Sequence, residues 1–294
     1  MIRVRTSSVV LVLIVALVAA ACGGSDSSDA ESPAATEVTL LTHDSFFIPP
    51  EVLEAFTAET GITVNVLQGG DAGAVVSQAI LTADRPTADV LFGIDNTFLS
   101  RALEAELFAP YESPRLDGVP DALELDPDHR VTPIDFGDVC LNYDRSAFGA
   151  DLAPPTELLD LIEPDYRGML VVENPASSSP GLAFRLATIA AFGEDGSYPW
   201  QAYWRDLAAN YVLIVGGWEQ AYNAEFSGGV GSGDRPLVVS YASSPPAEVI
   251  FSDPPPAEAP TAVIDTSCFR QIEFAGILRG SDAGAAAESL IDFM

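Results

Sequence analysis

Short apolar segments of strand length alternate along the chain with segments that carry a helical hydrophobic pattern. Strands are predicted at residues 37–42, 62–66 and 88–93, and helices follow Pro49-Pro50 and the turn at Gly69-Gly70-Asp71. This alternation predicts an α/β protein with a mostly parallel sheet. Ligands bind outside the carboxyl ends of the strands in such sheets, so polar residues that follow strands are candidate site residues.

The alternation continues through the second half of the chain, and no repeat of the solenoid type interrupts it. Further strands are predicted at residues 131–143, 168–172, 211–215 and 237–239, and further helices at residues 158–161 and 182–192. A chain of 294 residues is long enough for one large domain or two ordinary ones.

Acidic residues far outnumber basic ones, with 43 Asp and Glu against 13 Lys and Arg, and every basic residue is an Arg. The absence of Lys excludes a phosphate-binding P-loop and a Schiff-base enzyme, because both need that residue. The formal charge of −30 argues against nucleic acid as a partner, since phosphates are neutralised by basic side chains. An acid excess also favours solubility.

The N-terminal residues have the pattern of a signal peptide, predicted at residues 1–21. Two arginines precede an apolar run from Val9 to Ala21, which is shorter than the about 20 residues that a membrane-spanning helix needs. The run ends in three alanines and Cys22, which resembles the lipobox of bacterial lipoproteins. We expect Cys22 to be lipidated, residues 22–36 to form a flexible tether, and the protein to lie at the extracytoplasmic face of the membrane. The alternative is a plain secretory signal with an incidental Cys.

Two cysteines besides Cys22 follow the predicted signal peptide, namely Cys140 and Cys268. An even pair of cysteines outside the cytoplasm predicts a disulfide bond. We therefore expect one bridge that closes a long loop of the chain.

Patterns of catalytic or metal-binding residues are weak in the sequence. The two His, His43 and His129, do not stand at metal-ligand spacing from another His or Cys. No Gly-x-Ser-x-Gly elbow occurs, and the Gly-rich segment at residues 228–233 predicts a loop, not a dinucleotide site. We expect no enzyme, no metal site and no cofactor.

Polar residues next to predicted strand ends are candidate ligand-binding residues. Two pairs, Asp44-Ser45 and Asp95-Asn96, directly follow strands, although either Asp could instead be a cap or turn former. The three serines at residues 177–179 stand before a helix, where hydroxyls and free N–H groups bind phosphate. Ordinary N-capping is the alternative for these serines.

Aromatic residues form a second group of candidates. Trp218 and Tyr222 are four residues apart, so they would share one face of a helix. Core packing is the alternative for such a pair. Ser240 and Tyr241 stand at the end of another predicted strand.

Six segments in this order together resemble the thiamine-binding proteins of bacterial ABC importers. They lie at residues 42–46, 88–96, 133–137, 177–181, 217–222 and 240–245. The resemblance extends from residue 37 to the end of the chain. It implies a type II periplasmic-binding-protein fold, with two α/β lobes, a hinge of crossing strands and a ligand cleft between the lobes. Lobe one would contain residues 37–143 and 265–294, and lobe two residues 144–264.

The resemblance implies a substrate-binding lipoprotein that captures thiamine or its phosphates and delivers them to an ABC importer permease, and we expect a monomer. Thiamine combines a thiazolium cation with a flat aminopyrimidine, so carboxylates would offset its charge and aromatic faces would stack on its rings. The serines would bind its hydroxyethyl group or phosphate. The expected ligand-binding residues are Asp44, Ser45, Asp95, Asn96, Ser177, Ser178, Ser179, Trp218, Tyr222, Ser240 and Tyr241.

Two departures from the family pattern are expected to matter. Family members continue beyond the residue at which this sequence stops, so the resemblance implies truncation at the C-terminus and an incomplete lobe one. The family pattern also lacks Cys140 and Cys268, although the implied fold brings their two strands side by side near the hinge.

Two other functions remain open from the sequence. One is a receptor of the same fold for ferric iron or another small ligand, although ferric receptors of this superfamily use paired tyrosines and no adjacent Tyr pair occurs here. The other is an extracytoplasmic serine hydrolase, which would need a base, and only His43 and His129 are available.

Overall fold

The computed structural model describes residues 35–294, so the predicted signal peptide and Cys22 lie outside the described residues. The strands are β1 (Glu37–Thr42), β2 (Thr63–Gln68), β3 (Val90–Asp95), β4 (Phe108–Ala109), β5 (Thr132–Asp144), β6 (Leu170–Glu173), β7 (Leu213–Val215), β8 (Leu237–Tyr241) and β9 (Thr261–Leu278). The α-helices are α1 (Pro50–Thr60), α2 (Ala72–Leu81), α3 (Leu99–Glu104), α4 (Ser179–Phe192), α5 (Trp200–Ala209), α6 (Ser244–Ile250) and α7 (Ala285–Phe293). Within this part of the chain, no helix is both long and apolar enough to cross a membrane.

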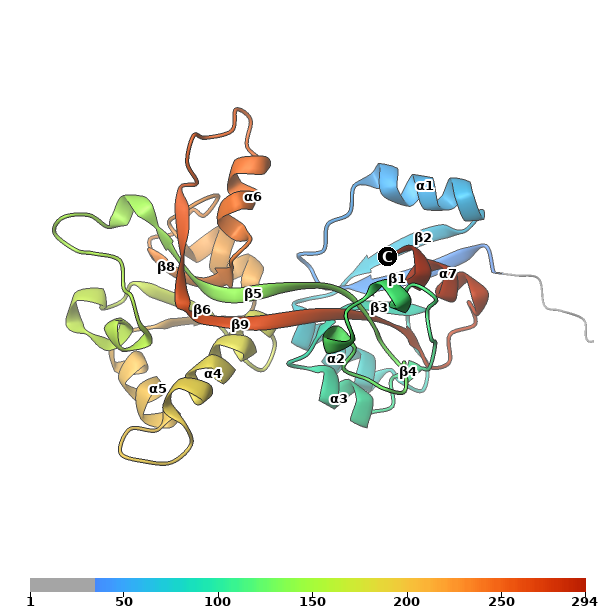
Figure 1. Ribbon diagram of the computed structural model, residues 1–294, viewed down its shortest axis with the longest axis horizontal. Helices are drawn as coiled ribbons and strands as arrows, with labels where there is room; N and C mark the ends of the chain where they lie inside the picture. The colour runs from blue at the N-terminus through green and yellow to red at the C-terminus, as the bar shows by residue number, and fades with distance from the viewer. Residues whose placement is uncertain (1–34) are drawn as a thin grey trace, which may run out of the picture. The chain divides into compact units, whose positions relative to one another are not determined.

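The strands form one sheet in the order β2-β1-β3-β9-β5-β8-β6-β7, with β4 paired to β9. Parallel strands lie at its two ends, where β1 pairs with β2 and β3, and β6 pairs with β7 and β8. The long strands β5 and β9 run antiparallel through the middle and connect both ends, as the green and red ribbons of Figure 1 show. The expectation of a mostly parallel sheet is therefore correct for the ends and wrong for the middle.

We call β5 and β9 the hinge strands, the part around β2-β1-β3 lobe one, and the part around β8-β6-β7 lobe two. This is the two-lobed arrangement that the resemblance implies. The residue boundaries given for the lobes from the sequence stay predictions.

Lobe one has a core on each face of its strands, because successive strand residues point to opposite faces. Leu41 packs with residues of α2 and α3, whereas its neighbour Leu40 packs with Phe56 of α1 and Leu290 of α7. Helices therefore cover both faces of these strands with apolar side chains. Polar side chains that could contact a ligand lie at the ends of the strands.

Lobe two follows the same rule. Val172 packs toward α4 and α5 in a cluster with Tyr203, whereas its neighbour Val171 packs with Tyr222 and Phe226 on the other face. The segment after β7 that carries Tyr222 is a π-helix, Gln220–Glu225.

Two predicted elements differ from the structure. The helix expected at residues 158–161 is a 3₁₀ turn, Leu158–Ile162, because Asp160 bonds back to the N–H groups of Thr156 and Glu157 and Pro164 follows closely. Tyr211 has a φ of 65°, which a strand does not accept, so β7 begins only at Leu213.

The disulfide expected from the sequence is present and joins the two hinge strands. The Sγ atoms of Cys140 and Cys268 are 2.03 Å apart. The register of β5 and β9 shifts between Val139 and Leu141, so extra residues of β9 bulge opposite Cys140. The bridge therefore fixes the pairing of the hinge strands at this irregular point.

Candidate functional site

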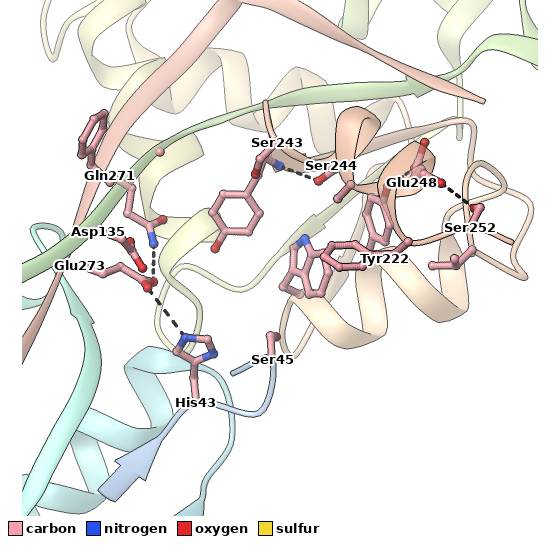
Figure 2. A pocket seen from close by; sticks show the side chains of 17 residues that line it. His43, Ser45, Asp135, Tyr222, Ser243, Ser244, Glu248, Ser252, Gln271 and Glu273 are labelled. Atoms are coloured by element: carbon pink, nitrogen blue, oxygen red, sulfur yellow. Dashed lines mark hydrogen bonds and ion pairs between the residues drawn. The ribbon is translucent and has the colours of Figure 1, made fainter. Parts of the chain in front are cut away.

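A cavity of about 530 Å³ lies between the lobes, a size within the usual range of small-molecule sites. Its walls come from the end of β1, from both hinge strands, from the segment after β7 and from α6 (Figure 2). Aromatic side chains, carboxylates and serine hydroxyls make up most of its lining, and no Arg is among the residues that line it. This combination suits a ligand that is flat and positively charged.

Trp218 and Tyr222 form a stacked aromatic pair on the lobe-two side of the cavity. Their ring centroids are 5.0 Å apart and the rings are inclined by 16°. Trp218 Nε1 donates a hydrogen bond to Ser240 Oγ over 2.9 Å, and the Tyr241 ring lies 6.1 Å from the indole. The spacing of four residues thus places both rings on one face, as predicted, although the helix is of the π type.

The glycines before Trp218 allow the chain to pass close to lobe one. Trp218 N donates to Asp71 Oδ2 over 2.9 Å, and a Cβ on Gly217 would stand only 2.9 Å from that same oxygen. A side chain at residue 217 would therefore separate the two segments. Ala74 N also donates to Ser177 O over 3.2 Å, so the lobes touch beside the cavity.

Glu248 of α6 fixes the position of Tyr222 by binding its hydroxyl group. The Tyr222 hydroxyl donates to Glu248 Oε1, and Thr261 Oγ1 donates to Glu248 Oε2 over 2.6 Å. Burial, and then the neighbouring carboxylate, raise the pKa of the Tyr222 hydroxyl. The tyrosine thus stays neutral and presents its ring to the cavity.

The opposite wall is polar and is built on the hinge strands and the end of β1. His43 Nε2 lies 3.9 Å from Glu273 Oε2, and the imidazole packs against Gly93, whose φ is 91°. Burial and the nearby carboxylates raise the pKa of Glu273 to about 8, and burial lowers the pKa of His43. Desolvation also raises the pKa of Asp135. At neutral pH the raised pKa of Glu273 favours its protonated, uncharged form.

Four of the eleven expected ligand-binding residues line the cavity: Ser45, Trp218, Tyr222 and Tyr241. Seven do not: Asp44, Asp95, Asn96, Ser177, Ser178, Ser179 and Ser240. Ser240 lies directly behind the indole of Trp218, to which its hydroxyl is bonded. The roles of these residues toward a ligand stay predictions.

The pair at the end of β3 makes local bonds. Asp95 is fully buried and accepts hydrogen bonds from Thr97 Oγ1 and from Phe98 N. These bonds agree with the alternative from the sequence, in which Asp95 forms a turn. Burial raises the pKa of Asp95 to about 6. Asn96 bonds through both side-chain atoms to the backbone of β9, at Arg270 O and Ile272 N.

The serines before α4 also lie off the cavity. Ser177 Oγ donates to Gly216 O over 2.7 Å, which ties the serine segment to the glycines before Trp218. Ser178 and Ser179 are both buried. The Ser178 hydroxyl has no hydrogen-bond partner among residues 35–294, whereas the Ser179 hydroxyl interacts with the Asp95 carboxyl group and lowers its pKa. Asp44 is an exposed residue, and partial desolvation followed by the charge of Asp71 raises the pKa of its carboxyl group.

Sequence reasoning missed the polar wall of the cavity. Asp135 was within a recognised segment but had no assigned role, and His43 was weighed only as a metal ligand or as the base of a hydrolase. A signal for Gln271 and Glu273 did exist, because residues two apart on a strand point to the same face. The third missed carboxylate, Glu248, lies on a short helix with no recognisable motif.

Among residues 35–294, no group of three or more His, Cys, Asp or Glu is arranged to hold a metal ion.

The family model for bacterial extracellular solute-binding proteins matches residues 85–245, which is more than half of the chain. The chain belongs to this family. It is accordingly an extracytoplasmic binding protein of the kind that serves ABC importers, and not an enzyme.

Among its curated relatives are thiamine-binding periplasmic proteins. The one from Salmonella typhimurium is 28% identical over 262 residues, which cover 87% of this chain and 75% of the relative. The one from Brucella abortus is also 28% identical, over 71% of this chain and 60% of the relative. The solute-binding protein therefore spans between about three fifths and three quarters of the length of these relatives.

Solved structures agree on the fold. A periplasmic thiamin binding protein has a TM-score of 0.73 at 24% identity, with 87% of this chain and 77% of that chain covered. The iron-bound HitA of Pseudomonas aeruginosa has a TM-score of 0.66 at 19% identity, with 88% and 80% covered. The type II periplasmic-binding fold implied by the resemblance is thus confirmed.

Proposed function

We propose that this solute-binding protein captures thiamine or one of its phosphate esters between its lobes and delivers it to an ABC importer permease. The observation that carries the proposal is the composition of the cavity, in which a stacked aromatic pair faces carboxylates and no Arg lines the walls. The names of the curated relatives support the same ligand.

The physical chemistry of thiamine fits these walls. A cation over an aromatic face gains roughly 0.5 to 2 kcal/mol, depending on how far both are desolvated. The indole of Trp218 and the ring of Tyr241 offer such faces, while Glu273 and Asp135 can offset the positive charge. The flat aminopyrimidine and thiazolium rings can stack on the aromatic side chains of the cavity. A bare metal ion has no ring and would make no such contact.

We further propose that Cys22 anchors the protein to the membrane and that it acts there as a monomer. The Ala-Ala-Ala-Cys junction before a small, polar, acidic tether supports the anchor. The tether would let the binding domain reach its permease.

Isothermal titration of the purified protein with thiamine tests the proposal. We expect saturable binding of thiamine, and weaker or no binding of spermidine and ferric citrate in parallel titrations. Thiamine monophosphate and diphosphate in the same series would rank the esters. A protein that binds spermidine or iron but not thiamine would contradict the proposal.

Trp218→Ala locates the site of binding. We expect this variant to bind thiamine at least tenfold more weakly, about 1.4 kcal/mol, because the stacking face is lost. Its loss of stability should stay below the roughly 3 to 5 kcal/mol of a fully buried Trp→Ala, since Trp218 is only half-buried. Trp200→Ala is the matched control, because Trp200 lies outside the cavity and packs against Arg185. Unchanged affinity in folded Trp218→Ala would exclude this residue from the site.

A further inference from the structure

The hinge strands present three hydrogen-bonding side chains to the cavity. Gln271 and Glu273 are two residues apart on β9, and Asp135 of β5 pairs with Glu273 in the register of the two strands. Figure 2 shows the three side chains close together, with His43 below them. They come from the crossing strands, so both lobes share this wall.

The orientation of the Gln271 amide is set by its neighbour. Gln271 Nε2 donates to Glu273 Oε1 over 2.6 Å. This bond is retained when a bound cation favours the ionised form of Glu273, because an ionised carboxylate only accepts hydrogen bonds. The amide nitrogen is therefore fixed toward Glu273, and Gln271 Oε1 is left as an acceptor on the other side.

That acceptor is buried and unused. Gln271 is 3% exposed, and its Oε1 has no hydrogen-bond partner among residues 35–294. A buried polar atom without a partner costs free energy, so a ligand that supplies a donor there removes the penalty. The unpartnered Gln271 Oε1 thus indicates, independently of the aromatic pair, that a bound molecule donates a hydrogen bond at this wall.

The side chains of Gln271, Glu273 and Asp135 offer acceptor atoms that suit a ligand with N–H donors. Gln271 Oε1 and the carboxylates of Asp135 and Glu273 are all acceptors when the acids are ionised. The nearest Arg of the hinge, Arg270, is bonded to Asp138, so it does not neutralise these acids. The titratable groups around Glu273 are His43, Asp71, Asp95, Asp135 and Tyr241.

We propose that Gln271, Glu273 and Asp135 form the specificity wall of the site, which binds the N–H edge of an amino-substituted nitrogen heterocycle. For thiamine this edge is the 4-aminopyrimidine, and naming that ligand rests on the proposed function. A flat heterocycle is favoured over a flexible amine because the aromatic pair Trp218 and Tyr222 forms the facing wall.

Oxythiamine tests this assignment, because an oxo group replaces the 4-amino group while the thiazolium stays the same. We expect the wild type to bind thiamine at least tenfold more tightly than oxythiamine in calorimetric titrations. The ratio should fall toward one in Gln271→Met and in Glu273→Gln, mainly through weaker thiamine binding. Asp135→Asn gives the same test from β5 if either β9 variant fails to fold, as judged by its thermal melt.

Asp138→Asn is the matched control, since it removes a hinge carboxylate that pairs with Arg270 and does not line the cavity. It should keep the wild-type ratio of thiamine to oxythiamine affinity. A ratio that is unchanged in folded Gln271→Met and Glu273→Gln would overturn the specificity wall and leave thiamine capture intact.

The fragment 4-amino-5-hydroxymethyl-2-methylpyrimidine separates the two proposals. If the wild type does not bind thiamine but binds this fragment, and Gln271→Met does not, the specificity wall is supported and the proposed function fails. If the wild type binds neither molecule, both proposals are overturned. Saturation-transfer NMR detects the weak binding expected of a fragment.

Discussion

At the scale of single residues, the cavity contains one acid, Glu273, whose raised pKa keeps it protonated at neutral pH. Burial, followed by the charges of Asp135 and Asp95, raises the pKa of Glu273 to about 8. Such a group becomes anionic most readily when a cation binds beside it. The acid is thus suited to a positively charged ligand and is neutral in its absence.

The raised pKa of Glu273 predicts how the stability of the empty protein depends on pH. In the unfolded chain the carboxyl loses its proton near its ordinary value of about 4.3, so between there and about 8 the folded state holds more protons. The contribution of this carboxyl group to the free energy of unfolding is therefore fully present below about pH 4.3. It is lost as the pH rises through about 8, the pKa in the folded state. Asp95, with a pKa of about 6, acts in the same direction.

We therefore expect the melting temperature of the ligand-free protein to fall between pH 5 and pH 8, and to fall less in Glu273→Gln. Thermal melts of both proteins across this range measure the difference. Parallel pH profiles for the two proteins would show that Glu273 titrates near its ordinary pKa.

At the scale of elements, the hinge strands organise the site and are the part that the sequence predicted least. A strand was expected at residues 131–143 and β5 spans Thr132–Asp144, but β9 was expected only as the strand that carries Cys268 near the hinge. Its 18 residues and its two register shifts against β5 depend on pairing with strands distant in sequence. The hydrophobic pattern of neighbouring residues predicts neither the length of β9 nor its register against β5.

The bridge between the hinge strands is expected to stabilise the fold. Cys140 and Cys268 are separated by 128 residues, and the chain-entropy model gives about 4 to 5 kcal/mol for a loop of that size. Cys140→Ser with Cys268→Ser should therefore lower the free energy of unfolding in urea by a similar amount. If reduction of the wild type and the double substitution both leave the urea midpoint unchanged, the bridge contributes no stability.

At the scale of the whole molecule, the sequence predicted the fold and the aromatic residues of one cavity wall, but not the polar residues of the other wall. Trp218 and Tyr222 were found because their spacing defines a helix face, and Tyr241 because it ends a strand. Asp95, an expected ligand residue, does not line the cavity and accepts hydrogen bonds from Thr97 and Phe98, because sequence does not tell which way a strand-end side chain points. His43 and Glu273 lie at opposite ends of the described chain, so only the fold brings them within 3.9 Å.

The proposed anchor predicts where the protein resides in the cell. Cys22→Ser should move it from the membrane fraction to the soluble fraction, because the lipidated side chain is removed. Fractionation followed by immunoblotting measures the distribution. A wild-type protein that is already soluble would show that no lipid anchor holds it.

The central claim is that thiamine binds between the aromatic pair and the hinge carboxylates. A crystal structure of the protein grown with thiamine tests it most directly. We predict thiamine in the cavity, with a ring stacked on Trp218 and the aminopyrimidine within hydrogen-bond distance of Gln271 Oε1 and Glu273. Thiamine bound elsewhere, or a cavity that stays empty at saturating thiamine, would contradict the account.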